Sequence, residues 1–76
     1  MDGIRYLGLV ALLKDKPEAG LRRGDVGTIV ELFEQNEHHP QGCIVEFVDE
    51  TGSVQALLDV TDFSEIVPLH LKLRAA

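Results

Sequence analysis

This chain of 76 residues has one cysteine, no tryptophan and only seven basic residues. These absences exclude several classes of protein. Cys43 is the only cysteine, so the disulfide framework of a small secreted domain cannot form within the chain. No apolar run approaches the roughly 20 residues of a membrane-spanning helix, and no basic cluster precedes an apolar stretch at the start. A cytoplasmic protein, neither secreted nor inserted in a membrane, is therefore expected.

The small supply of aromatic residues constrains the core. Aromatics make up 5% of the chain against 45% for all apolar residues, so the core is expected to consist of Leu, Val and Ile side chains. A chain of this length buries only roughly 60% of the surface that it exposes when unfolded. We expect a single domain over residues 1–76, with its core at about residues 7–73 and little room for a deep substrate cavity.

Acidic residues outnumber basic ones by 13 to 7, which gives a formal net charge of −6. A chain with this balance repels the phosphate backbone of DNA and RNA, since binding to that backbone depends on Lys and Arg. Nucleic acid is therefore a disfavoured partner.

Short apolar segments between turn residues predict five β-strands, because segments of this length with turn residues on both sides are typical of strands. In the third segment Cys43, Val45 and Phe47 share one face, which is expected to point to the core. Residues 34–42 include no apolar side chain and predict an exposed loop. The predicted strands lie at residues 7–13, 26–33, from 43 to a turn at 50–52, 53–60 and 66–74.

Five short strands with turns every eight to twelve residues or so are typical of small barrels and sandwiches. Because 76 residues are too few for a seven-stranded sandwich, we predict an all-β fold, a small five-stranded SH3-like barrel. One short helical turn is expected near residues 61–65, with Thr61 as its N-terminal cap. The Lys, Arg and Pro residues in the segment 66–74 suit an edge strand that is protected against aggregation.

Four motifs carry a resemblance to a known family. They are Leu9-Val10-Ala11-Leu12-Leu13, Pro17-Glu18-x-Gly20-Leu21-x-Arg23-Gly24-x-Val26-Gly27-Thr28-x-Val30-Glu31, Val45-Glu46-Phe47-Val48-Asp49-x-x-Gly52 and Ala56-Leu57-Leu58. In combination they resemble a bacterial family known only as domain of unknown function 4926, over about residues 9–69. The resemblance implies an SH3-like barrel and no established activity. Residues 24–30 are also similar to the turn and strand of KOW-type modules of ribosomal and transcription-factor proteins.

Residues that can ligate a metal or act as nucleophiles are present, but they form no recognised pattern. His38, His39, Cys43 and His70 carry atoms that can bind zinc, yet their spacing matches no structural zinc site. Neither Cys43 nor a serine has the accompanying residues that nucleophilic catalysis needs. We therefore predict no enzymatic activity, no metal and no cofactor.

Apolar residues on both faces of two predicted strands indicate a partner-binding surface. In the segment 7–13, apolar residues occur at both odd and even positions, and so on both faces of the strand. In the segment 53–60, Leu57 lies on the opposite face to Leu58 and Val60 and is also apolar. A small barrel has one interior, so some of these residues lie outside unless a loop, a register bulge, a homodimer or another protein covers them. The candidate partner-binding residues are Val10, Leu12, Arg22, Arg23, Glu31, Glu46 and Leu57.

These features favour a non-enzymatic protein-interaction module whose partner, another protein or a second copy, has basic groups around an apolar centre. An accessory protein or an immunity protein, such as an antitoxin that covers the active site of a basic toxin, is one subtype that fits. Arg22-Arg23 is the only basic doublet and is a candidate anchor for a carboxylate. The alternative is a KOW-like nucleic-acid-binding module that uses residues 21–24 and the loop around His38-His39.

Overall fold

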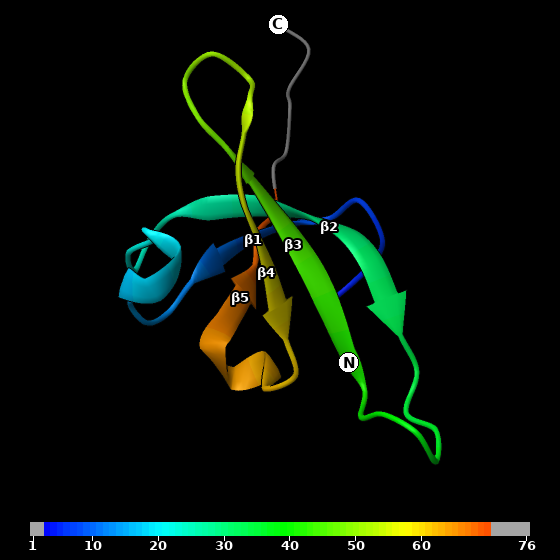
Figure 1. Ribbon diagram of the computed structural model, residues 1–76. Helices are drawn as coiled ribbons and strands as arrows, with labels where there is room; N and C mark the ends of the chain where they lie inside the picture. The colour runs from blue at the N-terminus through cyan, green and yellow to red at the C-terminus, as the bar shows by residue number, and fades with distance from the viewer. Residues whose placement is uncertain (1–2, 71–76) are drawn as a thin grey trace, which may run out of the picture.

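The computed structural model describes residues 3–70 as five β-strands and two single-turn 3₁₀ helices (Figure 1). The strands are β1 (Leu9–Leu12), β2 (Val26–Phe33), β3 (Gly42–Val48), β4 (Val54–Val60) and β5 (Ile66–Pro68), and the helices are η1 (Pro17–Ala19) and η2 (Phe63–Glu65). The predicted all-β fold with five strands is confirmed.

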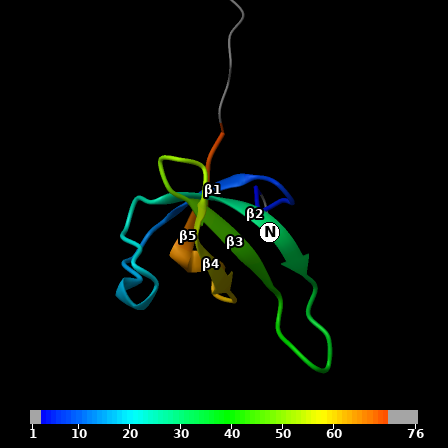
Figure 2. The same cartoon turned by 45° about the horizontal axis from the view of Figure 1, so that its top comes forward.

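The five strands form one antiparallel sheet in the order β4-β3-β2-β1-β5. The sheet is strongly twisted and curled, as two views of the molecule show (Figures 1 and 2). Within residues 3–70, β4 and β5 each pair with one neighbour and not with each other, so the sheet is open at both edges. The predicted SH3-like barrel is therefore not confirmed.

The core lies on one face of the sheet. Residues that lie opposite each other in antiparallel strands point to the same side, so the strand register identifies this face. Ile29 of β2 lies opposite Val45 of β3, which lies opposite Leu58 of β4. The buried side chains of this inner face come from all five strands, and Leu21 joins them from the turn before β2. They are Val10, Leu12, Leu21, Ile29, Cys43, Val45, Phe47, Val60 and Ile66.

A glycine allows β2 to approach β3 closely in the core. A Cβ atom at Gly27 would lie 2.6 Å from Val45 Cγ1 and 2.9 Å from Phe47 Cε2, closer than real side chains pack. The space above Gly27 is thus occupied by side chains of β3. Val10 of β1 lies opposite Gly27, and its side chain is also buried in the core.

The first predicted strand is shorter in the structure than the segment 7–13. Leu7 has a φ of 65°, in the left-handed region that a strand does not contain, so β1 begins only at Leu9. A turn in which the Gly8 N–H donates to the Arg5 carbonyl precedes the strand. At the other end β1 stops at Leu12.

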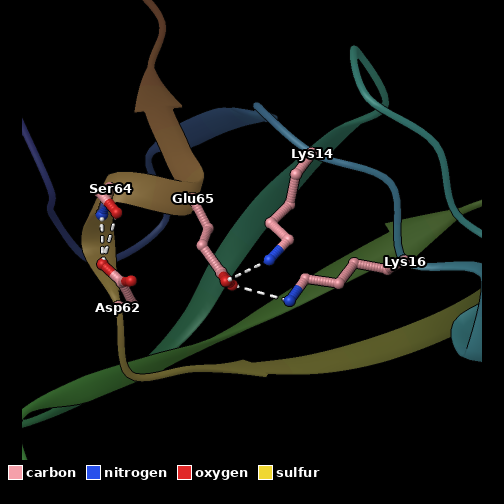
Figure 3. A network of polar contacts seen from close by, with 5 residues as sticks. All are labelled: Lys14, Lys16, Asp62, Ser64 and Glu65. Carbon is pink, nitrogen blue, oxygen red and sulfur yellow. Dashed lines mark hydrogen bonds and ion pairs between the residues drawn. The ribbon is translucent and has the colours of Figure 1, made fainter.

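The last segment also differs from its prediction. The strand predicted at 66–74 is β5, over Ile66–Pro68, and residues 71–74 lie outside the described residues. The cap of η2 is Asp62 rather than Thr61, because the Asp62 carboxylate lies next to the helix and accepts hydrogen bonds from the Ser64 backbone N (3.0 Å) and hydroxyl (2.6 Å) (Figure 3). The hydrogen bonds from Ser64 hold the pKa of Asp62 below its usual range.

Candidate protein-interaction surface

The outer face of the sheet, opposite the core, carries an apolar band that crosses all five strands. Val54 lies opposite Val48, and Ala11 lies opposite both Val26 and Val67. Val26 and Val48 line one shallow hollow, which joins the two halves of the band. We call these five residues the outer band, and its four valines are 37% to 57% exposed. A folded monomer thus presents apolar surface on the side of the sheet away from its core.

Three acidic side chains lie on the same face of the sheet as the outer band. Glu46 lies opposite Leu57, and Glu31 and Asp59 lie on either side of Ile44 in the adjacent row of the outer face. In the part of the chain that the structure describes, none of these three carboxylates forms a salt bridge. The outer face therefore combines exposed apolar area with uncompensated negative charge.

Three of the predicted partner-binding residues lie on this face. Leu57 is 61% exposed, and Glu46 lies directly opposite it on β3. Glu31 is exposed in the next row, beside Ile44. The structure thus brings Leu57 and Glu46 together and places Glu31 on the same side of the sheet.

The predicted placement of Val10 and Leu12 on the outside is wrong. Both side chains lie in the core, with exposures of 0% and 1%. Val10 lies opposite Gly27 and Leu12 opposite Ile66, and these are inner-face positions. Since β1 is apolar on both faces, alternation alone does not decide which face is buried, and Ala11 belongs to the outer band instead.

The valines of the outer band were absent from the predicted site, although the sequence holds a signal for them. Val48 has the opposite parity to Phe47, and Val26 the opposite parity to the inward position of Gly27. An apolar residue at the outward parity of a predicted strand is the feature that would have identified them. Strict alternation from Leu57 does not place Val54 on the outer face, because the β3–β4 register shifts next to it, and Val67 lies in a strand of only three residues.

The basic doublet Arg22-Arg23 lies in the turn before β2 rather than on a sheet face. The Arg22 backbone N donates to the Asp25 carboxylate (2.9 Å), and the Arg23 backbone N donates to the Asp15 carboxylate (2.8 Å). These two acids flank the doublet and reduce its local positive charge. Such a turn is a weak anchor for a phosphate backbone.

The residues considered for catalysis or metal binding have structural roles, in the core or in the 34–41 loop. Cys43 is fully buried, and burial, followed by the nearby charge of Asp59, raises the pKa of its thiol, which disfavours the nucleophilic thiolate. Asn36 Oδ1 accepts hydrogen bonds from the backbone N atoms of His38 (2.7 Å) and His39 (3.0 Å) and so shapes the exposed loop. Across residues 3–70, no three side chains of His, Cys, Asp or Glu gather closely enough to hold a metal ion.

A small cavity of about 210 Å³ opens where β2, β3 and the 34–41 loop meet. Gly42 is one of the lining residues, and a larger residue would not fit there, since a Cβ would lie 2.8 Å from the Val60 carbonyl oxygen. The Phe33 ring forms one wall and meets the His39 ring edge-on, with 5.7 Å between ring centroids. Asp59 also lines the cavity, so a cation with an apolar stem would find an aromatic ring and a carboxylate there.

A polar network joins the segment after β1 to η2 (Figure 3). Lys16 Nζ donates to Glu65 Oε1 at 2.7 Å, and Lys14 Nζ lies 3.3 Å from Glu65 Oε2. The hydrogen bond from Lys16 holds the pKa of Glu65 below its usual range, and the same bond raises the pKa of Lys16. The network contains no residue of the outer band and holds η2 against the segment after β1.

Replacing Glu65 by glutamine is expected to lower the melting temperature slightly at neutral pH, because partly exposed ion pairs contribute little. The pKa of Glu65 is lowered in the folded state, so its contribution is present above its ordinary pKa of 4.5 and is lost as the pH falls through the lowered value. The raised pKa of Lys16 keeps the pair intact up to alkaline pH. Thermal unfolding of wild type and Glu65→Gln at pH 7 and in acid measures the difference.

Glu50→Gln is the control for this measurement, since Glu50 is exposed in the β3–β4 turn and forms no salt bridge among the described residues. Its melting temperature should equal that of the wild type at both pH values. A difference between Glu65→Gln and wild type that persists unchanged in acid would show that the ion pair is not its source.

The chain matches the model of a known protein family. Residues 7–63, more than half of the chain, match the family described as Domain of unknown function (DUF4926). The chain belongs to this family. The family resemblance predicted from the motifs is thereby confirmed, and the DUF4926 match includes every residue of the outer band except Val67. No curated protein and no solved structure matches the chain.

Among the described residues of this DUF4926 member, no helix has the length and apolar character needed to cross a membrane.

Proposed function

We propose that the protein is a non-enzymatic interaction module that binds a basic partner protein through the outer band. The observation that carries the proposal is the row of exposed valines on β2, β3, β4 and β5, joined across β1 by Ala11, on the side of the sheet away from the core. Contiguous apolar surface of this kind marks interaction sites in soluble proteins. An interface built on it has an apolar centre and a polar rim.

The charge of the outer face supports a basic partner. Glu31, Glu46 and Asp59 flank the apolar rows without salt bridges of their own in residues 3–70. Lys and Arg side chains on a partner would neutralise them, and complementary charge accelerates association and selects the partner. The net charge of −6 adds long-range attraction for a basic protein.

The cavity beside Phe33 gives such a partner an anchoring point. A lysine or arginine side chain would place its apolar stem against the Phe33 ring and its charge near the Asp59 carboxylate. Aromatic rings attract cations more strongly when water is excluded from between them. Anchors of this type contribute much of the binding energy of an interface.

An accessory or immunity protein fits this proposal, and a basic toxin whose active site is covered by the outer face would be one such partner. The KOW-like alternative is less well supported. The acids of the outer face repel phosphate, and the Arg22-Arg23 turn is flanked by Asp15 and Asp25.

The test starts with capture of the tagged protein from its host, identification of bound protein by mass spectrometry, and an absorbance ratio for bound nucleic acid. The complex is then rebuilt from purified components. The double variant Glu46→Gln, Asp59→Asn is expected to bind the partner several-fold more weakly at low salt, because two attractive charges are lost. The difference should shrink as salt rises, since ions screen exposed charges.

The matched control is the double variant Glu18→Gln, Glu50→Gln, which removes the same charge from η1 and from the β3–β4 turn. It should bind almost as well as the wild type. Equal weakening by both double variants would mean that net charge alone drives binding, and no effect from either would place the interface elsewhere. Nucleic acid without a protein partner would favour the KOW-like alternative.

A further inference from the structure

The two edges of the open sheet are unequal. β5 consists of three residues and ends at Pro68, which has no N–H to offer another strand. β4 has seven residues, Val54–Val60, and pairs with β3 alone among the strands of residues 3–70. Its outer edge therefore presents unpaired backbone N–H and C=O groups to solvent.

Soluble proteins usually protect such an edge with lysine, proline, short strands or bulges. β4 includes neither lysine nor proline, and Asp59 is its only charged residue. The β3–β4 register shifts between Phe47 and Val48, which makes Gln55 the extra residue near the start of β4. From Ala56 to Val60 the ladder is regular, so this part of the edge is open to a further strand.

We propose that β4 pairs antiparallel with β4 of a second copy, about a two-fold axis at Leu57. In this register Leu57 lies opposite its own counterpart and Ala56 lies opposite Leu58, while Asp59 reaches the bulge at Gln55. No two like charges face each other, because Asp59 is the only charged residue of β4 and lies two positions from the axis. The edge is therefore self-complementary, as an isologous dimer interface requires.

The exposed side chains support this register. Leu57 is 61% exposed in the single chain, and pairing places two such side chains against each other at the axis. Ala56 and Leu58 point to the inner face and are only partly buried, so a neighbouring strand would cover them further. Apolar cross-strand pairs of this kind stabilise sheets.

The dimer goes beyond the proposed function and leaves the outer band of each copy free, since strands pair edge to edge while these side chains stand perpendicular to the sheet. Two copies would form one ten-stranded sheet with two outer bands on the same face. A partner with two sites would then bind with increased apparent affinity. The charge of −6 on each copy opposes association, so salt should strengthen the dimer.

Cysteine cross-linking tests the register directly. Leu57→Cys places two thiols opposite each other at the axis, where the Cα atoms of paired strands are about 4.5 to 5.5 Å apart and a disulfide fits. Under mild oxidation we expect most of this variant to run as a disulfide-linked dimer. Cys43 does not interfere, because it is fully buried.

Val54→Cys is the matched control on the same edge, with a similar exposure of 57% in the wild type. Its two copies would lie about 20 Å apart in the proposed register, at roughly 3.3 Å per residue, so it should remain monomeric on the gel. Equal cross-linking of both variants would indicate random collision and overturn the proposal.

Sedimentation equilibrium gives a second measurement that needs no cysteine. The wild type is expected to dimerise, more strongly at higher salt, whereas Leu57→Lys should be monomeric because two positive charges would face each other. Val67→Lys, on β5, should still dimerise. A wild type that stays monomeric at high salt and high concentration overturns the proposal and leaves partner binding by the outer band untouched, since that is measured with the partner present.

Discussion

Replacing Leu12 by alanine is expected to lower the free energy of unfolding by about 2 to 5 kcal/mol, as truncations of buried leucines do. Leu12 is 1% exposed and lies opposite Ile66 in the β1–β5 ladder. Its truncation removes apolar contacts and leaves a cavity where the short strand β5 is held. Because a domain of this size has only a few kcal/mol of stability to lose, much of the protein would be unfolded.

Leu13→Ala is the matched control, one residue further along and 44% exposed. It should change the free energy of unfolding by no more than about 0.5 kcal/mol, as surface substitutions do. Urea denaturation followed by circular dichroism measures both variants. If Leu13→Ala proves as costly as Leu12→Ala, the two faces of β1 have been assigned incorrectly.

Replacing Val48 by lysine is expected to weaken the complex with the partner protein by about 30- to 1000-fold, the range found for residues at the centre of an interface. Val48 is 51% exposed, lies opposite Val54 and shares a hollow with Val26, so it occupies the middle of the outer band. A lysine there would bring an ammonium group into the apolar centre, next to the basic groups of the partner. Calorimetric titration of the purified complex measures the loss.

Gln35→Lys controls for the added positive charge, since Gln35 is exposed in the loop between β2 and β3. It should bind the partner with nearly the affinity of the wild type. Circular dichroism should show both variants folded, because neither side chain is part of the core. Unchanged affinity for a folded Val48→Lys would mean that the outer band is not the binding surface.

The strands that could be predicted well have a strong local pattern. β2 begins and ends at the predicted residues, Val26 and Phe33, because it is rich in β-branched residues between a glycine turn and a polar loop. In β3 the alternation of Cys43, Val45 and Phe47 identifies the buried face correctly. Local residue preferences were sufficient in both cases.

The candidate site was predicted only in part. Leu57 lies on the outer face as expected, whereas Val10 and Leu12 belong to the core. β1 is apolar on both faces, so its orientation depends on the register with Gly27 and Ile66, far away in the sequence. No pattern within β1 contains that information.

The sequence by itself determined an all-β fold, a net charge of −6, its turns and its family, because composition, β-branched runs and turn residues act locally. Tertiary structure alone decided which face of β1 is buried, that the outer valines lie on one face, and that within residues 3–70 the sheet is open at β4. It also joined Lys16 to Glu65, which are 49 positions apart. Such features depend on strand register and on contacts between segments that are far apart in the sequence. The local pattern of one segment does not determine which other segment it contacts.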